Sequence, residues 1–502
     1  MMEGLLLGLQ TVLTPFNLML VLMGCAIGTI IGMLPGLGPI SAIALMIPVT
    51  YGFDPSSGMI LLAGVYYGAI FGGSTSSILI NAPGVAGTVA TSFDGYPMAN
   101  EQKEPGRALA TAAWSSFAGG TLAAVLLLLA APYLSELSLS FQSADYFLMM
   151  VLGLTLVTAF AGDGGHLKAL LMTFVGLALS TVGTDLTAGV QRFTFGRMDL
   201  IDGISFLLLA MGTFALSEAL MMVLRRDTPE ETIRISRAGL GVSKLDAVEI
   251  APPVARSSIL GFFVGVLPGA GATIASFLAY GMERTIARSA VPRFGAGNIK
   301  GLAAPEAANN AACTGSFVPL LTLGIPGSGT TAVLLGALIA YGIQPGPRLF
   351  IDEPEVFWSV IVSMYVGNLF LLVLNLPLIP YIARLLTIPR PFLIPVIMFF
   401  SMMGVYLVSF NSFDLQLLVL VAIAAVGLRI LNFPMAPLLL GFILGGMLED
   451  NLRRALTISN GDWAFLFERP SSVALLALIA IALFAPPLAR IADILVRTGS
   501  SR

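Results

Sequence analysis

Apolar segments long enough to cross a lipid bilayer recur along the whole chain, and they constrain its fold more than any other feature. A spanning helix needs about 20 apolar residues. Runs such as Leu122–Ala131 lack the alternation of a membrane β-strand, which excludes a β-barrel. Hydrophobic residues make up 57% of the 502 positions and charged residues only 11%. We therefore expect an all-α polytopic membrane protein with about 10–12 transmembrane segments.

The charged, cysteine and histidine residues exclude several classes of protein. The net charge of −3 leaves no basic face for nucleic acid. Cys25 and Cys313 form no CxxC pair, and one histidine, His166, cannot build an HExxH site. No GxxxxGK[ST] motif is present, and His166 is interpreted as an ordinary residue at a helix start. We expect no catalytic residues, no cofactor and no structural metal.

The positions of the basic residues predict the membrane topology. Lys103 is the first basic residue, and the densest basic stretch is 225–256. By the positive-inside rule this stretch and the next polar one, 283–300, are both cytoplasmic. The apolar segment 257–281 between them is interrupted at Pro268-Gly269. A re-entrant hairpin keeps both loops on one side and is favoured over a single kinked helix.

An internal repeat is visible in the glycine and proline residues. Residues 28–38 resemble 261–271 without a gap, and 73–88 resemble 315–331 at an offset that differs by about ten residues. Charge bias at matched positions is opposite, which predicts inverted repeats. The expected divisions are a first repeat half (1–224), a cytoplasmic basic linker (225–256), a second repeat half (257–448) and a C-terminal membrane segment with its tail (449–502). Further spans are expected near 108–132, 145–160, 166–183, 201–224, 356–382, 391–410, 414–431, 434–448 and 472–495.

Each half carries two Pro-Gly breaks, and these predict a transport site. Non-helical backbone at membrane depth is tolerated only where protein or a water-filled cavity satisfies its polar groups. Helix N-termini at such a break attract a carboxylate, and free carbonyl oxygens attract Na⁺. Hydroxyl and amide side chains gather at the breaks: Ser74, Thr75, Ser76, Ser77, Asn81, Thr88, Thr314, Ser316, Thr322, Ser328, Thr330 and Thr331. Any one of them can be a helix-packing residue, but the clusters favour a ligand site.

Several polar residues lie within apolar segments, where they are rare and often functional. Glu218 is interpreted either as a proton or cation site or as a partner of Arg225 or Arg226. Asn368 and Asn375 lie about two turns apart on one span and either bond neighbouring helices or face the transport path.

A further polar group, Glu306, Asn309 and Asn310, precedes the second broken segment. Two interpretations remain open for it: an access-side gate or ion ligand, or simple capping, since Pro305 followed by Glu306 is typical of a helix start.

The chain resembles the large permease subunit of the tripartite tricarboxylate transporters. The segments that carry the resemblance are Ala304–Ala311, Gly315–Leu338, Gln344–Pro347, Leu34–Pro39, Tyr67–Gly84 and Leu448–Arg454. The resemblance extends from about residue 15 to 495 and implies a symporter in the bacterial inner (cytoplasmic) membrane that imports a tri- or dicarboxylate with Na⁺ or H⁺. It also implies two partners, a small four-helix membrane subunit and a periplasmic solute-binding protein that delivers the substrate.

The resemblance also implies the binding residues. Substrate and ion contacts are expected at Ser74, Thr75, Ser76, Asn81, Pro83 and Gly84 and at Ser316, Pro326, Gly327, Ser328, Thr330 and Thr331. Pro35-Gly36 and Pro268-Gly269 match the other family motifs. The expected mechanism is alternating access, with a bundle that holds the breaks moving against a scaffold. An ion or anion channel with broken-helix selectivity elements is the alternative.

Overall fold

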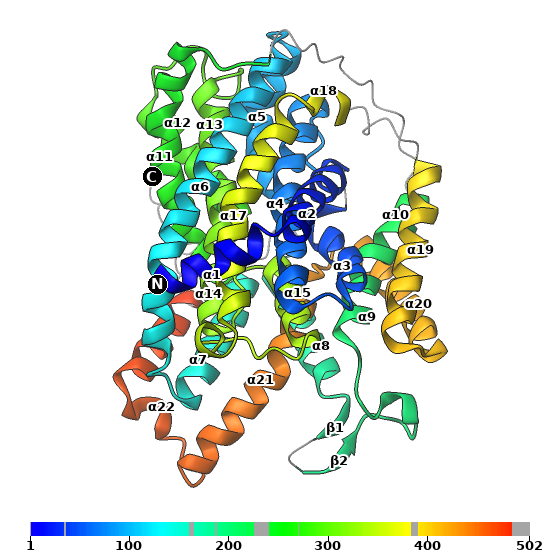
Figure 1. Cartoon of the computed structure of the whole chain (residues 1–502). Helices are drawn as coiled ribbons and strands as arrows, with labels where there is room; N and C mark the ends of the chain where they lie inside the picture. Colours follow the sequence, from blue (N-terminus) through cyan, green and yellow to red (C-terminus); the bar gives the residue numbers. More distant parts are fainter. Residues whose placement is uncertain are drawn as a thin grey trace, which may run out of the picture. The chain divides into compact units, whose positions relative to one another are not determined.

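The computed structural model describes residues 2–34, 37–159, 165–185, 188–224, 240–269, 271–382 and 390–483 (Figure 1). Apart from one two-stranded hairpin, the regular structure in these ranges is helical, which confirms the all-α prediction. Eight of the described helices are long and apolar enough to cross a membrane, fewer than the expected segments. Expected spans near 145–160, 166–183 and 472–495 correspond to shorter apolar helices.

The chain divides into two compact units, which are described separately. Unit 1 comprises Met1–Ser135 and Ser205–Gly427, and unit 2 comprises Glu136–Ile204 and Leu428–Arg502. The predicted division into repeat halves and a linker cuts the chain elsewhere and remains a prediction.

The helices of unit 1 follow in chain order. They are α1 (Met2–Val12), α2 (Pro15–Met33), α3 (Gly38–Thr50), α4 (Pro55–Ile80), η1 (Ala86–Thr88), α5 (Val89–Asn100), α6 (Pro105–Ser138, which extends into unit 2), α9 (Phe206–Ala210), the π-helical turn η3 (Met211–Leu216), α10 (Ser217–Leu224), α11 (Lys244–Val266), α12 (Gly271–Ile286), α13 (Ile299–Gly315), α14 (Phe317–Leu323), α15 (Gly329–Ala340), α16 (Leu349–Asp352), α17 (Pro354–Asn375), α18 (Ile379–Ile382), α19 (Arg390–Ser409) and α20 (Ser412–Ile430, which also extends into unit 2).

Glycines allow the central helix pairs of unit 1 to touch backbone to backbone. A methyl group added to Gly28 or Gly32 of α2 would lie 2.2 or 2.1 Å from a carbonyl oxygen of α4. Gly261 and Gly265 of α11 would meet carbonyl oxygens of α13 at 2.4 and 2.2 Å. Small residues four apart permit such close packing in membranes. The glycines that match in the sequence repeat therefore make matching contacts.

Two helix pairs in unit 1 fold back on themselves at a Pro-Gly break. Arg256 of α11 donates from Nε and Nη2 to Glu283 of α12, at 2.8 and 2.9 Å, across the break at Pro268-Gly269. A straight helix would separate residues 256 and 283 by about 40 Å. In the α2–α3 pair, Phe16 at the start of α2 and Phe53, three residues after the end of α3, meet edge to face with ring centroids 5.7 Å apart. Helices α11 and α12 therefore run back along one another, and the re-entrant hairpin expected for 257–281 remains a prediction.

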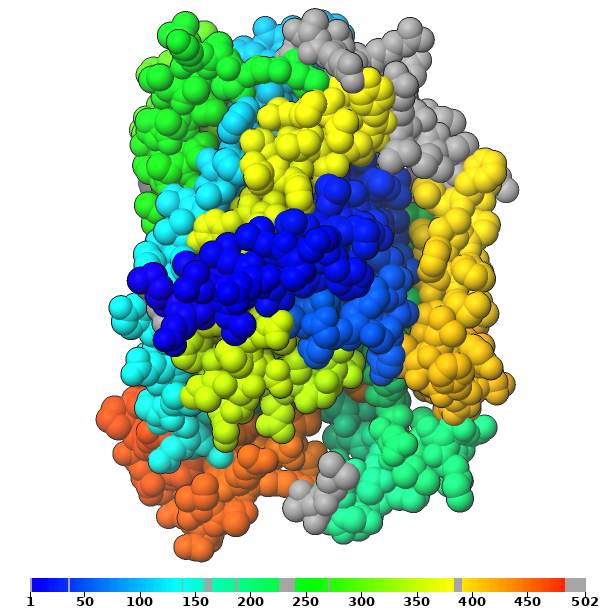
Figure 2. All heavy atoms as spheres, in the orientation of Figure 1, coloured from blue at the N-terminus to red at the C-terminus, as the bar shows by residue number. Residues whose placement is uncertain are grey.

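The N-terminal helix packs on the outside of unit 1. Figure 2 shows the dark-blue α1 lying across the yellow α17. Gly8 permits this close approach, since a methyl group there would lie 2.7 Å from the Trp358 backbone oxygen. Trp358 is itself almost fully buried beneath α1.

Unit 2 contains α7 (Ser143–Ala159), α8 (His166–Ser180), the strands β1 (Gly183–Asp185) and β2 (Val190–Arg192), η2 (Met198–Leu200), α21 (Ala436–Ile458), α22 (Phe465–Glu468) and an apolar helix over Pro470–Leu483. The strands pair antiparallel with Thr184 opposite Gln191, and the sequence analysis did not predict them. Arg453 and Arg192 bind the carboxylates of Asp185 and Glu449, which fixes the strand pair to α21. His166 is the first residue of α8, as expected.

Replacing Asp145 with asparagine is expected to destabilise unit 2 by about 2 kcal/mol. This buried carboxylate accepts hydrogen bonds from the Arg469 guanidinium, from the Ser471 and Ser472 hydroxyls and from the Gln142 backbone. An amide cannot accept all four and leaves the arginine without its counter-charge. Thermal unfolding in detergent measures the loss.

Asp462→Asn is the matched control, because Asp462 is exposed and caps Ala464 through an oxygen that asparagine retains. Equal melting temperatures for the two variants would contradict the role given to Asp145.

Candidate functional site

Helix α13 begins earlier than the sequence analysis predicts. The Asn298 side chain caps it by accepting from the backbone N–H groups of Lys300 and Gly301, at 2.9 and 3.3 Å. Pro305 lies inside the helix. The expectation of a helix start at Pro305-Glu306 is therefore wrong, because the asparagine cap takes over that role two turns upstream. Simple capping no longer explains Glu306, which lies within the helix.

The Glu306 carboxylate is the centre of a buried polar cluster. Its Oε2 accepts from the hydroxyls of Ser74 on α4 and Ser116 on α6, at 2.7 and 2.8 Å. Its Oε1 accepts from the Thr91 hydroxyl of α5. The Glu306 side chain is fully buried, and all three of these partners are uncharged. Hydroxyl donors satisfy the carboxylate oxygens but do not neutralise their charge.

Only part of this cluster is predictable from the sequence. Glu306 and Ser74 were expected site residues, whereas Thr91 and Ser116 lie outside the Pro-Gly breaks and were not expected. Neither residue stands out from the other hydroxyl residues of its apolar helix, so no sequence signal distinguishes them.

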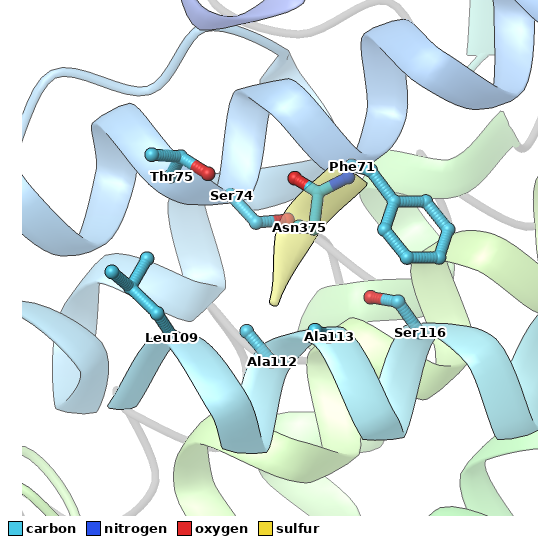
Figure 3. A pocket seen from close by; sticks show the side chains of 8 residues that line it. All are labelled: Phe71, Ser74, Thr75, Leu109, Ala112, Ala113, Ser116 and Asn375. Carbon is cyan, nitrogen blue, oxygen red and sulfur yellow. The ribbon is translucent and has the colours of Figure 1, made fainter. Parts of the chain in front are cut away.

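A small cavity adjoins the cluster and is drawn in Figure 3. Its lining comes from α4, α6 and the last residue of α17: Phe71, Ser74, Thr75, Leu109, Ala112, Ala113, Ser116 and Asn375. The cavity volume, taken as the space open to the centre of a water molecule, is about 10 Å³. That volume accommodates about one water molecule or one bare monovalent ion, and no carboxylate substrate.

The two asparagines of α17 have different environments. Asn375 lines the cavity, and its Nδ2 donates to the Leu371 backbone oxygen at 3.0 Å. Its Oδ1 is buried and lacks a hydrogen-bond partner. Asn368 packs instead against α6, where a methyl group added to Gly120 would lie 3.0 Å from its Nδ2.

The second break of each half ends a helix in the same way. α4 is capped by Asn81 and α14 by Gly324, and both capping residues adopt a left-handed conformation, with φ of 53° and 70°. The next residues continue the match: Ala82 N–H donates to the Ser76 carbonyl, and Ile325 N–H to the Pro319 carbonyl. A left-handed cap satisfies the last carbonyl groups of a helix and turns the chain sharply.

Within each predicted half, the second break lies against the helix that leads into the first. A methyl group added to Gly84 would lie 1.9 Å from the Gly32 carbonyl oxygen, and one added to Gly327 would lie 3.2 Å from that of Gly265. In the second half the breaks also bond directly, since Gly269 N–H donates to the Gly327 carbonyl at 2.9 Å.

Asn309 lies between η1, which follows the Pro83-Gly84 break, and the start of α12, which follows the Pro268-Gly269 break. Neither its Oδ1 nor its Nδ2 has a hydrogen-bond partner, although the side chain is fully buried. A methyl group added to Gly87 of η1 would lie 2.2 Å from Asn309 Oδ1 and 3.4 Å from the side chain of Ala272, at the start of α12. An unpaired buried amide costs about 1–3 kcal/mol, which a ligand with complementary polar atoms would recover.

The structure places the remaining predicted residues as follows. Thr75 lines the cavity. Three side chains donate to backbone carbonyl groups near them: Ser76 Oγ to Gly73, Ser316 Oγ to Cys313 and Asn310 Nδ2 to Glu306. Ser328 and Thr331 form a capping box on α15. Thr330 is 7% exposed, Pro83 and Pro326 lie within the breaks, Pro268 follows α11, and Glu218 is buried on α10. Pro35 and Gly36, with Arg225 and Arg226, lie outside the described residues.

Comparison with known proteins identifies the family. The sequence profile of the tripartite tricarboxylate transporter TctA family matches residues 18–440. An uncharacterised 52.8 kDa protein in the TAR-I ttuC′ 3′ region of Agrobacterium vitis is 44% identical over 478 residues, which cover 95% of this chain and 94% of the relative. A second uncharacterised protein, in the TAR-II ttuC′ 3′ region of the same organism, is 45% identical over 218 residues, which cover 43% of this chain and 90% of that protein. No solved structure matches.

The profile and the first relative each extend over most of the chain, and the apolar helices agree with a multi-pass membrane protein. The members of this family are transporter components and not enzymes. The chain belongs to the TctA family, the large membrane component of the tripartite tricarboxylate transporters of bacteria.

Proposed function

We propose that the chain is a secondary active symporter that imports a tri- or dicarboxylate together with Na⁺ or H⁺. It would act in the bacterial inner membrane, with a small four-helix membrane subunit and a periplasmic solute-binding protein that delivers the substrate. Membership of the TctA family supports the substrate class and the partners. The observation that carries the proposal is the buried, unpaired carboxamide of Asn309, placed where breaks from both halves meet.

The repeat halves belong to the proposal as inverted structural repeats. The support is the set of matching contacts: α2 on α4 beside α11 on α13, and the left-handed caps at Asn81 and Gly324. The α2–α3 and α11–α12 pairs would be the re-entrant hairpins of the two halves. The ion pair between Arg256 and Glu283 supports this for the second hairpin, because it holds the two outer arms together.

The substrate would bind at the Asn309 junction. Two helices begin there, α12 at Gly271 and α5 at Val89 directly after η1. Helix N-termini carry partial positive charge and unpaired N–H groups, which suit a carboxylate. The Asn309 amide would donate to a carboxylate oxygen. Alternating access would then move the bundle with the breaks against the rest of the protein.

The test is uptake of a radiolabelled carboxylate panel into proteoliposomes that hold this chain and its small subunit. The soluble binding protein is added outside, with imposed Na⁺ or pH gradients. Symport predicts uptake that requires the binding protein and one of the gradients. Flux that requires neither would favour the alternative, an ion or anion channel.

The double variant Ser74→Ala, Thr330→Ala is expected to lose most of this uptake, because it removes a break hydroxyl from each half. Ser115→Ala serves as its control. Full transport by the double variant would contradict a binding role for these hydroxyls.

A further inference from the structure

The cavity beside Glu306 presents oxygen atoms whose lone pairs are free. Ser74 and Ser116 both line it, and both donate their hydroxyl protons to Glu306 Oε2. Once the proton of a hydroxyl is committed, only its lone pairs remain to face a ligand. The Ser74 and Ser116 oxygens therefore act as acceptors toward the cavity.

Asn375 supplies an independent indication of a ligand. It is 4% exposed, and its buried Oδ1 has no partner. Its Nδ2 is held by the Leu371 carbonyl, which directs Oδ1 away from its own helix. Figure 3 shows the Asn375 carboxamide at the cavity, across from α6. An acceptor fixed in this way requires a donor or a cation.

The electrostatic setting favours a cation. The Glu306 carboxylate lies one hydrogen bond behind the cavity wall, and none of the eight lining residues is charged. Asn375 is the last residue of α17, a helix of 22 residues, so the negative end of that helix dipole also faces the site. A buried carboxylate whose partners are all neutral is costly until a positive charge approaches it.

We propose that this cavity binds a sodium ion, held by the hydroxyl oxygens of Ser74 and Ser116 and the carboxamide oxygen of Asn375, with Glu306 balancing its charge. The volume admits one bare monovalent cation. Hydroxyl and carbonyl oxygens are the ligands that transporters use for Na⁺. A proton alone would reside on Glu306 and would leave the Asn375 oxygen unexplained. The role of this ion as the coupling cation rests on the proposed function.

The test measures ion binding by the whole purified chain, without substrate or partner proteins. Thermal unfolding is followed in nanodiscs as NaCl replaces KCl or choline chloride at constant ionic strength and constant pH. A ligand that binds only the folded state raises the melting temperature in a saturable way. We expect a saturable, Na⁺-specific rise. Ser116→Ala and Asn375→Leu should each weaken the apparent Na⁺ affinity by at least about tenfold, because each removes one ligand oxygen.

Two variants separate ligation from packing. Ser115→Ala, at the neighbouring buried serine that does not line the cavity, should keep wild-type Na⁺ affinity. Asn375→Asp retains an oxygen and should keep the Na⁺ response that Asn375→Leu loses. Wild-type Na⁺ affinity in both Ser116→Ala and Asn375→Leu would overturn the site. A wild-type melting temperature that follows pH but ignores Na⁺ would overturn the sodium assignment in favour of a proton.

Ion binding and transport can fail separately in this design. Carboxylate uptake driven by a pH gradient, with no Na⁺ response, would reject the sodium site and leave the proposed symport intact. Na⁺ binding that depends on Ser116 and Asn375, without uptake of any carboxylate, would keep the site and reject the proposed function.

Discussion

Replacing Glu306 with glutamine is expected to lower gradient-driven carboxylate uptake by at least about tenfold. Glutamine keeps the size of the side chain. Its oxygen accepts from the hydroxyls on one side, and a hydroxyl facing its NH2 group can turn and accept from that group, so the packing of α13 against α4, α5 and α6 should be retained. The variant removes the negative charge that would balance the charge of the coupling cation. Charge-assisted hydrogen bonds contribute about 1.5–3 kcal/mol, and every 1.4 kcal/mol is a factor of ten in affinity. Initial uptake rates in proteoliposomes measure the effect.

Glu355→Gln is the control for the loss of one carboxylate. Glu355 lies in the first turn of α17 and accepts an exposed hydrogen bond from Thr11. Its neutralisation should leave uptake within about twofold of wild type, because exposed polar contacts contribute little. If Glu306→Gln transports as well as Glu355→Gln at equal protein levels, the buried carboxylate has no part in coupling.

Gly32→Ala is expected to destabilise the chain by roughly 1–3 kcal/mol or more, because it overpacks the contact between α2 and α4. The added methyl carbon would lie 2.1 Å from the Ala69 carbonyl oxygen and 2.5 Å from its Cα. Both atoms belong to the backbone of a buried helix, so relief requires the two helices to separate. The melting temperature of the purified protein measures the loss. Impaired folding should also lower its yield in the membrane.

Gly281→Ala isolates the steric part of this effect. Gly281 lies within α12, and a methyl group there would meet no atom within 4 Å. Both substitutions gain the same helix propensity, up to about 1 kcal/mol over glycine. Gly281→Ala should therefore be neutral or stabilising. Equal destabilisation by both variants would mean that the loss of glycine itself, and not the close contact, is responsible.

The positions of several helix ends could be predicted from the sequence. α2 ends at Met33, α11 at Val266 and α14 at Leu323, each just before a Pro-Gly or Gly-x-Pro-Gly segment that the sequence analysis marked as a break. Proline lacks the N–H that a helix needs, and glycine adopts the left-handed cap conformation without strain. These are local properties of the chain. The start of α13 was missed because a capping asparagine at 298 outweighs the Pro305-Glu306 pattern.

The hydropathy of the chain by itself determined its class, because a bilayer forces every spanning segment to be apolar and internally hydrogen-bonded. The proline and glycine residues determined where the breaks lie, and the hydroxyl and amide residues beside them determined that the breaks are polar. Only the tertiary structure decided which polar residues meet. The hydroxyls around Glu306 come from Ser74, Thr91 and Ser116, which are 232, 215 and 190 residues away in sequence. The tertiary structure likewise places Asn375 at the cavity and packs Asn368 against α6. Helix periodicity gives the face of a residue on its own helix, but the neighbour across that face depends on how separate helices pack, which no local pattern encodes.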